Sequence, residues 1–73
     1  MSKKLNMTRE EFRQKILEFR HAGGMTQEEL ADYLGGITTS TIQKWERGAV
    51  VPNSSAMIGK LLTMRVLDET NLG

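Results

Sequence analysis

The sequence has no cysteine, one proline, one histidine and few aromatic residues, which make up 5% of its 73 positions. Without cysteine the chain has no disulfide and no cysteine-ligated zinc site, and this composition is compatible with a reducing cytoplasm. No apolar run approaches the roughly 20 residues of a membrane span, and the charged N-terminus lacks the apolar stretch of a secretion signal. We therefore expect one small cytoplasmic domain with no part in a membrane.

Catalytic groups are also scarce, which argues against an enzyme. The single histidine, His21, lies near the end of a predicted helix, where its charge suits the helix dipole. The sequence shows no glycine-rich phosphate loop behind a strand and no pair of carboxylates placed for acid–base work. We expect no catalytic residue, no metal site and no cofactor.

Positive and negative charges are almost equal in number, with 10 Lys and Arg, 9 Asp and Glu, and a net charge of +1. Proteins that bind nucleic acids are often more basic, so the overall charge gives little support for that function. Any basic face must come from the placement of particular side chains.

The sequence carries the same strong signal for the start of a helix twice. A threonine stands three residues before a glutamate, which is the spacing of a capping box, and apolar residues just before and four positions after the cap match a hydrophobic staple. We predict one helix from the first cap to Gly23-Gly24 and another over 27–34. The residues are Thr8, Glu11, Met7 and Phe12 at the first start, and Thr26, Glu29, Met25 and Leu30 at the second.

The first of these helices has a single apolar stripe. Phe12, Ile16 and Phe19 recur at intervals of four and three residues and therefore share one face. The charged residues between them, Arg20 included, are most simply a solvated face. We expect the apolar stripe to pack on the core.

The stretch 26–48 predicts two short helices joined by a tight turn. The first helix has apolar residues spaced for one face, and Gly35-Gly36 then ends it, because glycine readily adopts the left-handed conformation of a helix exit. The hydroxyl residues at 38–41 offer caps for the second helix. The small residue Ala31 allows the two helices to cross closely, as in a helix-turn-helix.

The second helix of this unit, over about 39–47, has two different sides. Its only large apolar residues, Ile42 and Trp45, face the core, which leaves short hydroxyls, an amide and cations outside. Such side chains contact base edges and phosphates in DNA, although an ordinary polar helix face has the same composition. The outward residues are Thr39, Ser40, Gln43, Lys44 and Arg47.

Pro52 separates this unit from a fourth helix, which Asn53 or Ser54 can cap. The apolar side of that helix comes from Met57, Ile58, Leu61, Leu62, Met64 and Val66. The lysines near the N-terminus are either simply solvated or in contact with a phosphate backbone. The expected divisions are a flexible basic arm over 1–7, a folded domain over 8–67 and a frayed tail over 68–73.

These motifs resemble the Cro/repressor-type helix-turn-helix family, often called Xre-like. The resemblance covers about Phe12 to Met64, and it implies an all-α fold, a compact bundle of four to five short helices like the lambda-repressor DNA-binding domain. It also implies binding to double-stranded operator DNA. The segments that carry it are Met25 to Ala31, Leu34-Gly35, Ser40 to Gly48, and Pro52 four residues later.

The family pattern also implies roles for particular residues. It implies base contacts by Thr39, Ser40, Lys44 and Gln43. It implies phosphate contacts by Gln27, Thr38 and Thr41, to which we add Thr26, Arg13 and Arg47 from their charge or their place at a helix start.

Two features depart from the family pattern. The interval from the turn glycine to the inward isoleucine, Gly35 to Ile42, is one residue longer than usual, so Gly36 looks like an insertion that shifts or tilts the second helix. The segment before Pro52 is often basic in the family. Here it is Ala49-Val50-Val51, which suggests fewer backbone contacts or an apolar patch used by a partner.

The sequence therefore predicts a sequence-specific DNA-binding regulator, most simply a repressor that acts as a homodimer. The alternative is a protein-interaction module, such as an antitoxin that binds a toxin, and Val50-Val51 and the tail favour it. In either case we expect a bacterial or phage-encoded protein in the cytoplasm, associated with DNA. We place the dimer surface at Met57, Met64, Leu67 and Leu72.

Overall fold

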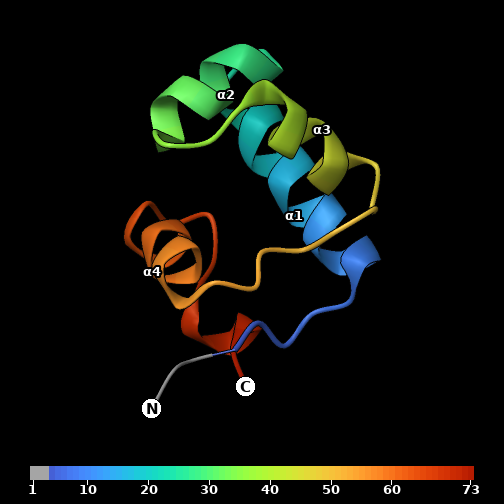
Figure 1. The fold of residues 1–73 in the computed structure, drawn as a ribbon, viewed down its shortest axis with the longest axis vertical. Helices are drawn as coiled ribbons and strands as arrows, with labels where there is room; N and C mark the ends of the chain where they lie inside the picture. The colour runs from blue at the N-terminus through green and yellow to red at the C-terminus, as the bar shows by residue number, and fades with distance from the viewer. Residues whose placement is uncertain (1–3) are drawn as a thin grey trace.

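Residues 4–73 are described by a computed structural model, in which they form four α-helices and one 3-10 helix (Figure 1). The prediction of an all-α bundle of four to five short helices is confirmed. Within these residues, no helix is both long and apolar enough to cross a membrane. The helices are α1 Arg9–Ala22, α2 Gln27–Leu34, α3 Thr39–Glu46, α4 Ser55–Thr63 and the 3-10 helix η1 Glu69–Asn71.

Both predicted capping boxes are present. In the first, Thr8 Oγ1 accepts from the Glu11 amide at 3.1 Å, while Glu11 Oε1 accepts from the Thr8 amide at 2.8 Å. The second box, Thr26 with Glu29, has the same pair of distances. Each box satisfies two amides that the start of a helix otherwise leaves without a partner.

The caps of α3 and α4 are single hydroxyls. Thr38 Oγ1 accepts from the Thr41 amide at 3.3 Å, and Ser54 Oγ accepts from the Met57 amide at 3.0 Å. Of the two predicted candidates for the cap of α4, the serine therefore takes that position. The predicted break between α2 and α3 is also present, and both residues of Gly35-Gly36 have positive φ.

The core lies where α3 packs against α1 and α2. The rings of Phe12 in α1 and Trp45 in α3 meet edge to face, with their centroids 5.2 Å apart and their planes at 88°, an arrangement that aromatic pairs favour. The predicted inward residues Ile42 and Trp45 are 0% and 3% exposed, and Ala31 in α2 is buried as well. This packing fixes which side of α3 faces away from the protein.

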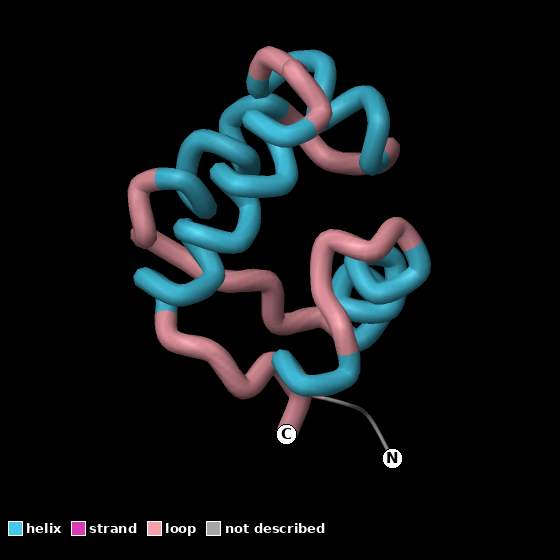
Figure 2. Tube along the Cα trace, turned by 180° about the vertical axis from the view of Figure 1, so that it is seen from behind, coloured by secondary structure: helices cyan, strands magenta, loops and turns pink. Residues whose placement is uncertain are grey.

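The helix α4 is set apart from the other three in both views of the backbone (Figures 1 and 2). Apolar side chains connect it to them: Leu61 is fully buried, and Val66 and Leu67 just beyond the helix are buried too. Pro52 is buried in the loop that leads into α4. The position of α4 therefore depends on side-chain contacts more than on close approach of backbones.

The two ends of the described chain lie together, whereas the flexibility of the arm and the fraying of the tail stay predictions. Leu5 and Leu72 form an antiparallel bridge, flanked by two backbone hydrogen bonds of 2.7 and 2.9 Å. Asp68 caps η1 by accepting from the Thr70 amide at 2.9 Å, and the Thr70 hydroxyl holds the pKa of this carboxyl below its usual range. These bonds order a tail whose polar sequence has no helical period. The start of the predicted arm, Lys3 included, lies outside the described residues.

Arg65 has a φ of +65°, the one positive value outside glycine in residues 4–73. It stands just past α4, where its amide donates to the Leu62 carbonyl at 3.1 Å and the next amide, that of Val66, donates to the Leu61 carbonyl at 2.9 Å. Glycine usually occupies this position at the end of a helix, because a β-carbon is strained at positive φ.

Arg65→Gly is expected to raise the free energy of unfolding by about 0.5–1 kcal/mol, because glycine relieves the strain at positive φ. Thr63→Gly, in the last position of α4, is the matched control and should lower that free energy by up to about 1 kcal/mol. Urea unfolding followed by the fluorescence of Trp45 measures both. Equal destabilisation by the two substitutions would contradict the strain assigned to Arg65.

Candidate nucleic-acid interface

One side of α3 is open to solvent along its whole length. Ser40, Gln43, Lys44 and Arg47 are exposed there, at helical spacings that place them on a common face. Thr39, in the first turn, is half-buried. The exposed face combines a hydroxyl, an amide and two cations, which are groups that suit the donors and acceptors of base edges and the charge of phosphates.

Glu46, the last residue of α3, is directed inward and joins three helices. Arg20 in α1 donates to it twice, from Nε to Oε2 at 2.7 Å and from Nη2 to Oε1 at 3.0 Å, and Gln27 in α2 donates from Nε2 to Oε1 at 3.0 Å. The remaining Nη1 of Arg20 donates to the Met25 carbonyl at 3.0 Å. The side chains of Arg20 and Glu46 are 17% and 7% exposed, so this network is largely shielded from water.

The protonation state of Glu46 follows from these contacts. Burial by itself raises the pKa of its carboxyl, but the hydrogen bonds from Arg20 and Gln27 and the charges of Arg20 and His21 outweigh burial and hold the pKa below its usual value of 4.5. The hydrogen bond to Glu46 likewise raises the pKa of the Arg20 guanidinium. The pair is therefore ionised at neutral pH, and its two charges largely cancel.

A shallow hollow of about 450 Å³ opens beside this network, where α1, α2 and α3 meet. Its lining includes the guanidinium groups of Arg13 and Arg47 and the amides of Gln27 and Gln43. It also includes the carboxylate of Glu46, which is already paired with Arg20. One of the guanidinium groups, on Arg13, also pairs with Glu10 at 2.9 Å in a contact open to solvent, and such a pair is weak. An anionic group of phosphate size is well suited to these donors. The lining residues are Arg13, Leu17, Gln27, Gln43, Glu46 and Arg47.

Hydroxyl groups stand at the starts of α2 and α3. Thr26 Oγ1 accepts from the Glu29 amide at 3.1 Å, and Thr38 Oγ1 accepts from the Thr41 amide and lies 3.2 Å from the Thr41 hydroxyl. Because the oxygens of Thr26 and Thr38 act as acceptors in these caps, a hydroxyl proton is left at each helix start to be donated outward.

Comparison with protein families identifies the family to which this arrangement of helices belongs. A family model described as helix-turn-helix matches residues 16–58, more than half of the chain. The chain belongs to the Cro/repressor-type helix-turn-helix family. It is a DNA-binding transcription regulator with a lambda-repressor-like all-α fold. Comparisons with curated proteins and with solved structures find no match.

In this helix-turn-helix regulator, the residues predicted to contact DNA fall into two groups. Arg13, Gln27, Gln43 and Arg47 meet around the hollow, although they come from three different helices. The others are spread over the helix starts and the outer face of α3 and do not line the hollow. They are Thr26, Thr38, Thr39, Ser40, Thr41 and Lys44.

The pair that supports this interface is the part that the sequence did not predict. The expectation that Arg20 lies on a solvated face is wrong, because its side chain is only 17% exposed and its guanidinium is paired with Glu46. The spacing of residues in the sequence could have predicted this pair, because Arg20 follows Ile16 by four residues and Glu46 follows Ile42 by four. Each charged residue therefore lies on the core side of its helix. Two opposite charges in such positions can be removed from water only when they pair with each other.

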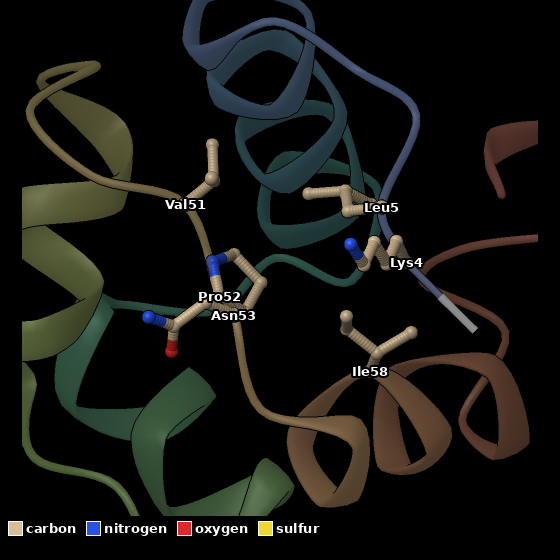
Figure 3. A pocket seen from close by; sticks show the side chains of 6 residues that line it. All are labelled: Lys4, Leu5, Val51, Pro52, Asn53 and Ile58. Atoms are coloured by element: carbon tan, nitrogen blue, oxygen red, sulfur yellow. The ribbon is translucent and has the colours of Figure 1, made fainter. Parts of the chain in front are cut away.

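The regulator has a second hollow, of about 280 Å³, between the N-terminal segment, the loop before α4 and α4 itself (Figure 3). Its lining is mostly apolar, and Val50, next to it in the sequence, is 43% exposed. Lys4, for which the sequence left a solvated and a phosphate-contacting role open, lines this hollow, whereas the residues of α1 to α3 that were predicted to contact DNA do not. The lining residues are Lys4, Leu5, Val51, Pro52, Asn53 and Ile58.

The side chains predicted to form the dimer surface are buried or partly buried within a single copy of the protein. Leu67 is 3% exposed and has no area to offer a second copy. Met57 and Met64 are half-buried against the core, and Leu72 is half-buried beside Leu5. Only the exposed atoms of these three side chains remain available to a partner.

Glu46→Gln is expected to lower the free energy of unfolding at pH 7 by about 2 kcal/mol, because Arg20 loses its charged acceptor. The folded pKa of Glu46 lies below its usual value of 4.5. The stabilisation from the ionised carboxylate is therefore complete above that value and is lost as the pH falls through the folded pKa. The difference between wild type and variant should therefore shrink as the pH falls below 4.5.

Urea unfolding at pH 7 and at pH 3 measures this difference. Glu18→Gln removes an exposed carboxylate of α1 and is the matched control, since a surface charge of this kind contributes little at either pH. A stability difference for Glu46→Gln that is the same at both pH values would rule out the charged role of Glu46.

Proposed function

We propose that this helix-turn-helix protein is a sequence-specific repressor that places α3 in the major groove of its operator. The observation that carries the proposal is the exposed polar face of α3, opposite the buried Ile42 and Trp45. An α-helix fits the major groove, where each base pair presents a distinct pattern of donors and acceptors.

The proposed base contacts follow from the chemistry of four side chains on α3. Lys44 is suited to donate to O6 and N7 of guanine, and the amide of Gln43 can both donate to and accept from adenine. Thr39 and Ser40 have short hydroxyls that suit several bases, and they lie at the N-terminal end of the helix. In this kind of docking, residues near the start of the recognition helix contact base edges.

The proposed phosphate contacts lie around the base-reading face. Gln27 donates one amide hydrogen to Glu46 and keeps a second one for a phosphate oxygen. Hydroxyls at helix starts are assisted by the helix dipole, which favours anions there. The six residues are Arg13, Gln27 and Arg47 around the hollow, and Thr26, Thr38 and Thr41 at the starts of α2 and α3.

The size of the domain favours a homodimer on DNA. The helix α3 has 8 residues, which is about 12 Å at 1.5 Å per residue, so one copy contacts only a few base pairs. Two copies on half-sites about 34 Å apart contact an operator long enough to be specific. A dimer that occupies such an operator excludes other proteins from the same DNA, which is the simplest form of repression.

A second candidate function is the binding of a protein partner, as an antitoxin binds its toxin. The observation that favours it is the mostly apolar hollow of Figure 3, together with the exposed Val50, which precedes the lining residue Val51 in the chain. Apolar surface of this kind suits a protein partner better than the charged DNA backbone. This function is compatible with DNA binding, because none of the residues that line the hollow lies on the outer face of α3.

Selection of duplexes from a random pool, together with DNA from upstream of the protein's own coding region, tests the repressor proposal. The wild-type protein is expected to enrich one motif and to bind it tightly, with affinity that falls steeply as salt rises. Scrambled duplex of the same length is the control. Failure to bind any duplex at low salt would refute the proposal and favour the protein-partner function.

Lys44→Ala is expected to weaken binding to the selected duplex by about 1–3 kcal/mol and to relax preference at one or two base pairs, with little effect on scrambled DNA. Arg47→Ala, on the same face, is the contrast: it should weaken binding to both duplexes and reduce the salt slope by about one. Fluorescence anisotropy over a salt series measures these changes. Unchanged affinity and preference in Lys44→Ala would exclude a base contact by Lys44.

A further inference from the structure

The turn between α2 and α3 contains two glycines in succession. Gly35 and Gly36 both have a φ of 73°, which glycine adopts without a steric penalty. Because glycine has no side chain to restrict its backbone, two in a row leave a turn with unusually many accessible conformations. A contact from elsewhere in the protein is needed to select one of them.

Lys60 of α4 makes such a contact. Its Nζ donates to the Gly35 carbonyl at 3.0 Å in a partly buried hydrogen bond. A β-carbon built on Gly35 or Gly36 would lie 3.7 or 3.8 Å from the same nitrogen, so the ammonium group lies across both glycines. Among the hydrogen bonds of residues 4–73, this is the one that ties the turn to a distant part of the chain.

The position of the Lys60 ammonium is also electrostatically favourable. Gly35 caps the C-terminal end of α2, where the helix dipole is negative and carbonyl oxygens lack partners within the helix. The last turn of α2 has no basic residue of its own. Lys60 supplies this cation from α4, and hydrogen bonds from a charged donor are stronger than neutral ones.

We propose that Lys60 is a positioning residue for DNA recognition, which fixes the glycine turn and thereby sets the place and tilt of α3 in the major groove. The inference rests on the proposed function. The helix α3 begins at Thr39, four residues after the Gly35 carbonyl that Lys60 holds. A change in the turn therefore moves Ser40 and Lys44, which we propose to contact the bases, although Lys60 itself needs no contact with DNA.

The fold has a second anchor near the turn, which makes the inference testable by substitution. Ile37 packs against the core, and Thr38 caps α3 through its own hydroxyl. Without the Lys60 ammonium, α3 is therefore expected to form and to stay attached. We expect the substitution to remove only the preference of the glycine turn for a single backbone conformation.

The test compares Lys60→Met, which keeps the aliphatic stem and removes the ammonium, with Arg65→Met, which removes an exposed cation just past the same helix. Lys60→Arg retains a charged donor and serves as the rescue variant. Each protein and the wild type select duplexes from the random pool. Affinity and salt slope are then measured on the wild-type motif and on scrambled duplex.

Lys60→Met is expected to bind the wild-type motif about tenfold more weakly, because the entropy lost in ordering the glycine turn then opposes binding. Its affinity for scrambled duplex and its salt slope should match those of wild type. Arg65→Met should select the wild-type motif, and Lys60→Arg should recover most of the affinity. An unchanged preference in Lys60→Met would overturn the proposal, and so would a salt slope reduced by about one, which indicates a direct phosphate contact.

Amide hydrogen exchange separates this role from a general loss of stability. In Lys60→Met, exchange should rise at the amides of Gly35 and Thr41, which donate to the Ala31 and Thr38 carbonyls on either side of the turn, while the amides of Phe12 and Ile16 in α1 stay protected. Faster exchange throughout the chain would contradict a local role for Lys60. If the wild type selects no motif, the proposed function fails, whereas the exchange comparison still decides whether Lys60 holds the turn.

Discussion

The ion pair between Arg20 and Glu46 is the contact on which the rest of the interface depends. Apolar burial is not directional, so Ile42 and Trp45 fix which side of α3 faces the core more firmly than they fix its exact rotation. A guanidinium and a carboxylate that meet through two hydrogen bonds define a plane and a direction. The pair therefore sets the last turn of α3 against α1 and, through Gln27, against the first turn of α2.

The same pair explains how a chain with a net charge of +1 can present a basic face. A carboxylate at the junction of three helices, beside the proposed phosphate contacts, would repel DNA if it were unpaired. Arg20 cancels that charge, while Arg13 and Arg47 remain on the rim of the hollow. Buried ion pairs add little net stability compared with apolar residues of the same size, so its main contribution is to geometry and to the local balance of charge.

Much of the fold could be predicted from the sequence because its signals are local. The two capping boxes at Thr8 and Thr26, and the inward spacing of Ile42 and Trp45, involve residues no more than four positions apart. The Arg20–Glu46 pair, the contact of Lys60 with the glycine turn and the pairing of the two ends join residues far apart in the chain. Periodicity carries no information on such partners, so the residue types of the candidate site could be predicted but the contacts that hold them could not.

The pairing of Leu5 with Leu72 bears on the order in which the protein folds and opens. The contacts that assemble α1 to α3, such as that of Phe12 with Trp45, join residues that are closer in the sequence than Leu5 and Leu72, and such contacts form more quickly. The bridge instead closes a loop of almost the whole chain, and the entropy lost in loop closure grows with loop length. It is therefore the contact expected to form last and to open first. Opening it would release Leu5 from the hollow of Figure 3 while α3 stays in place, so this surface can fray and close again within an otherwise native molecule.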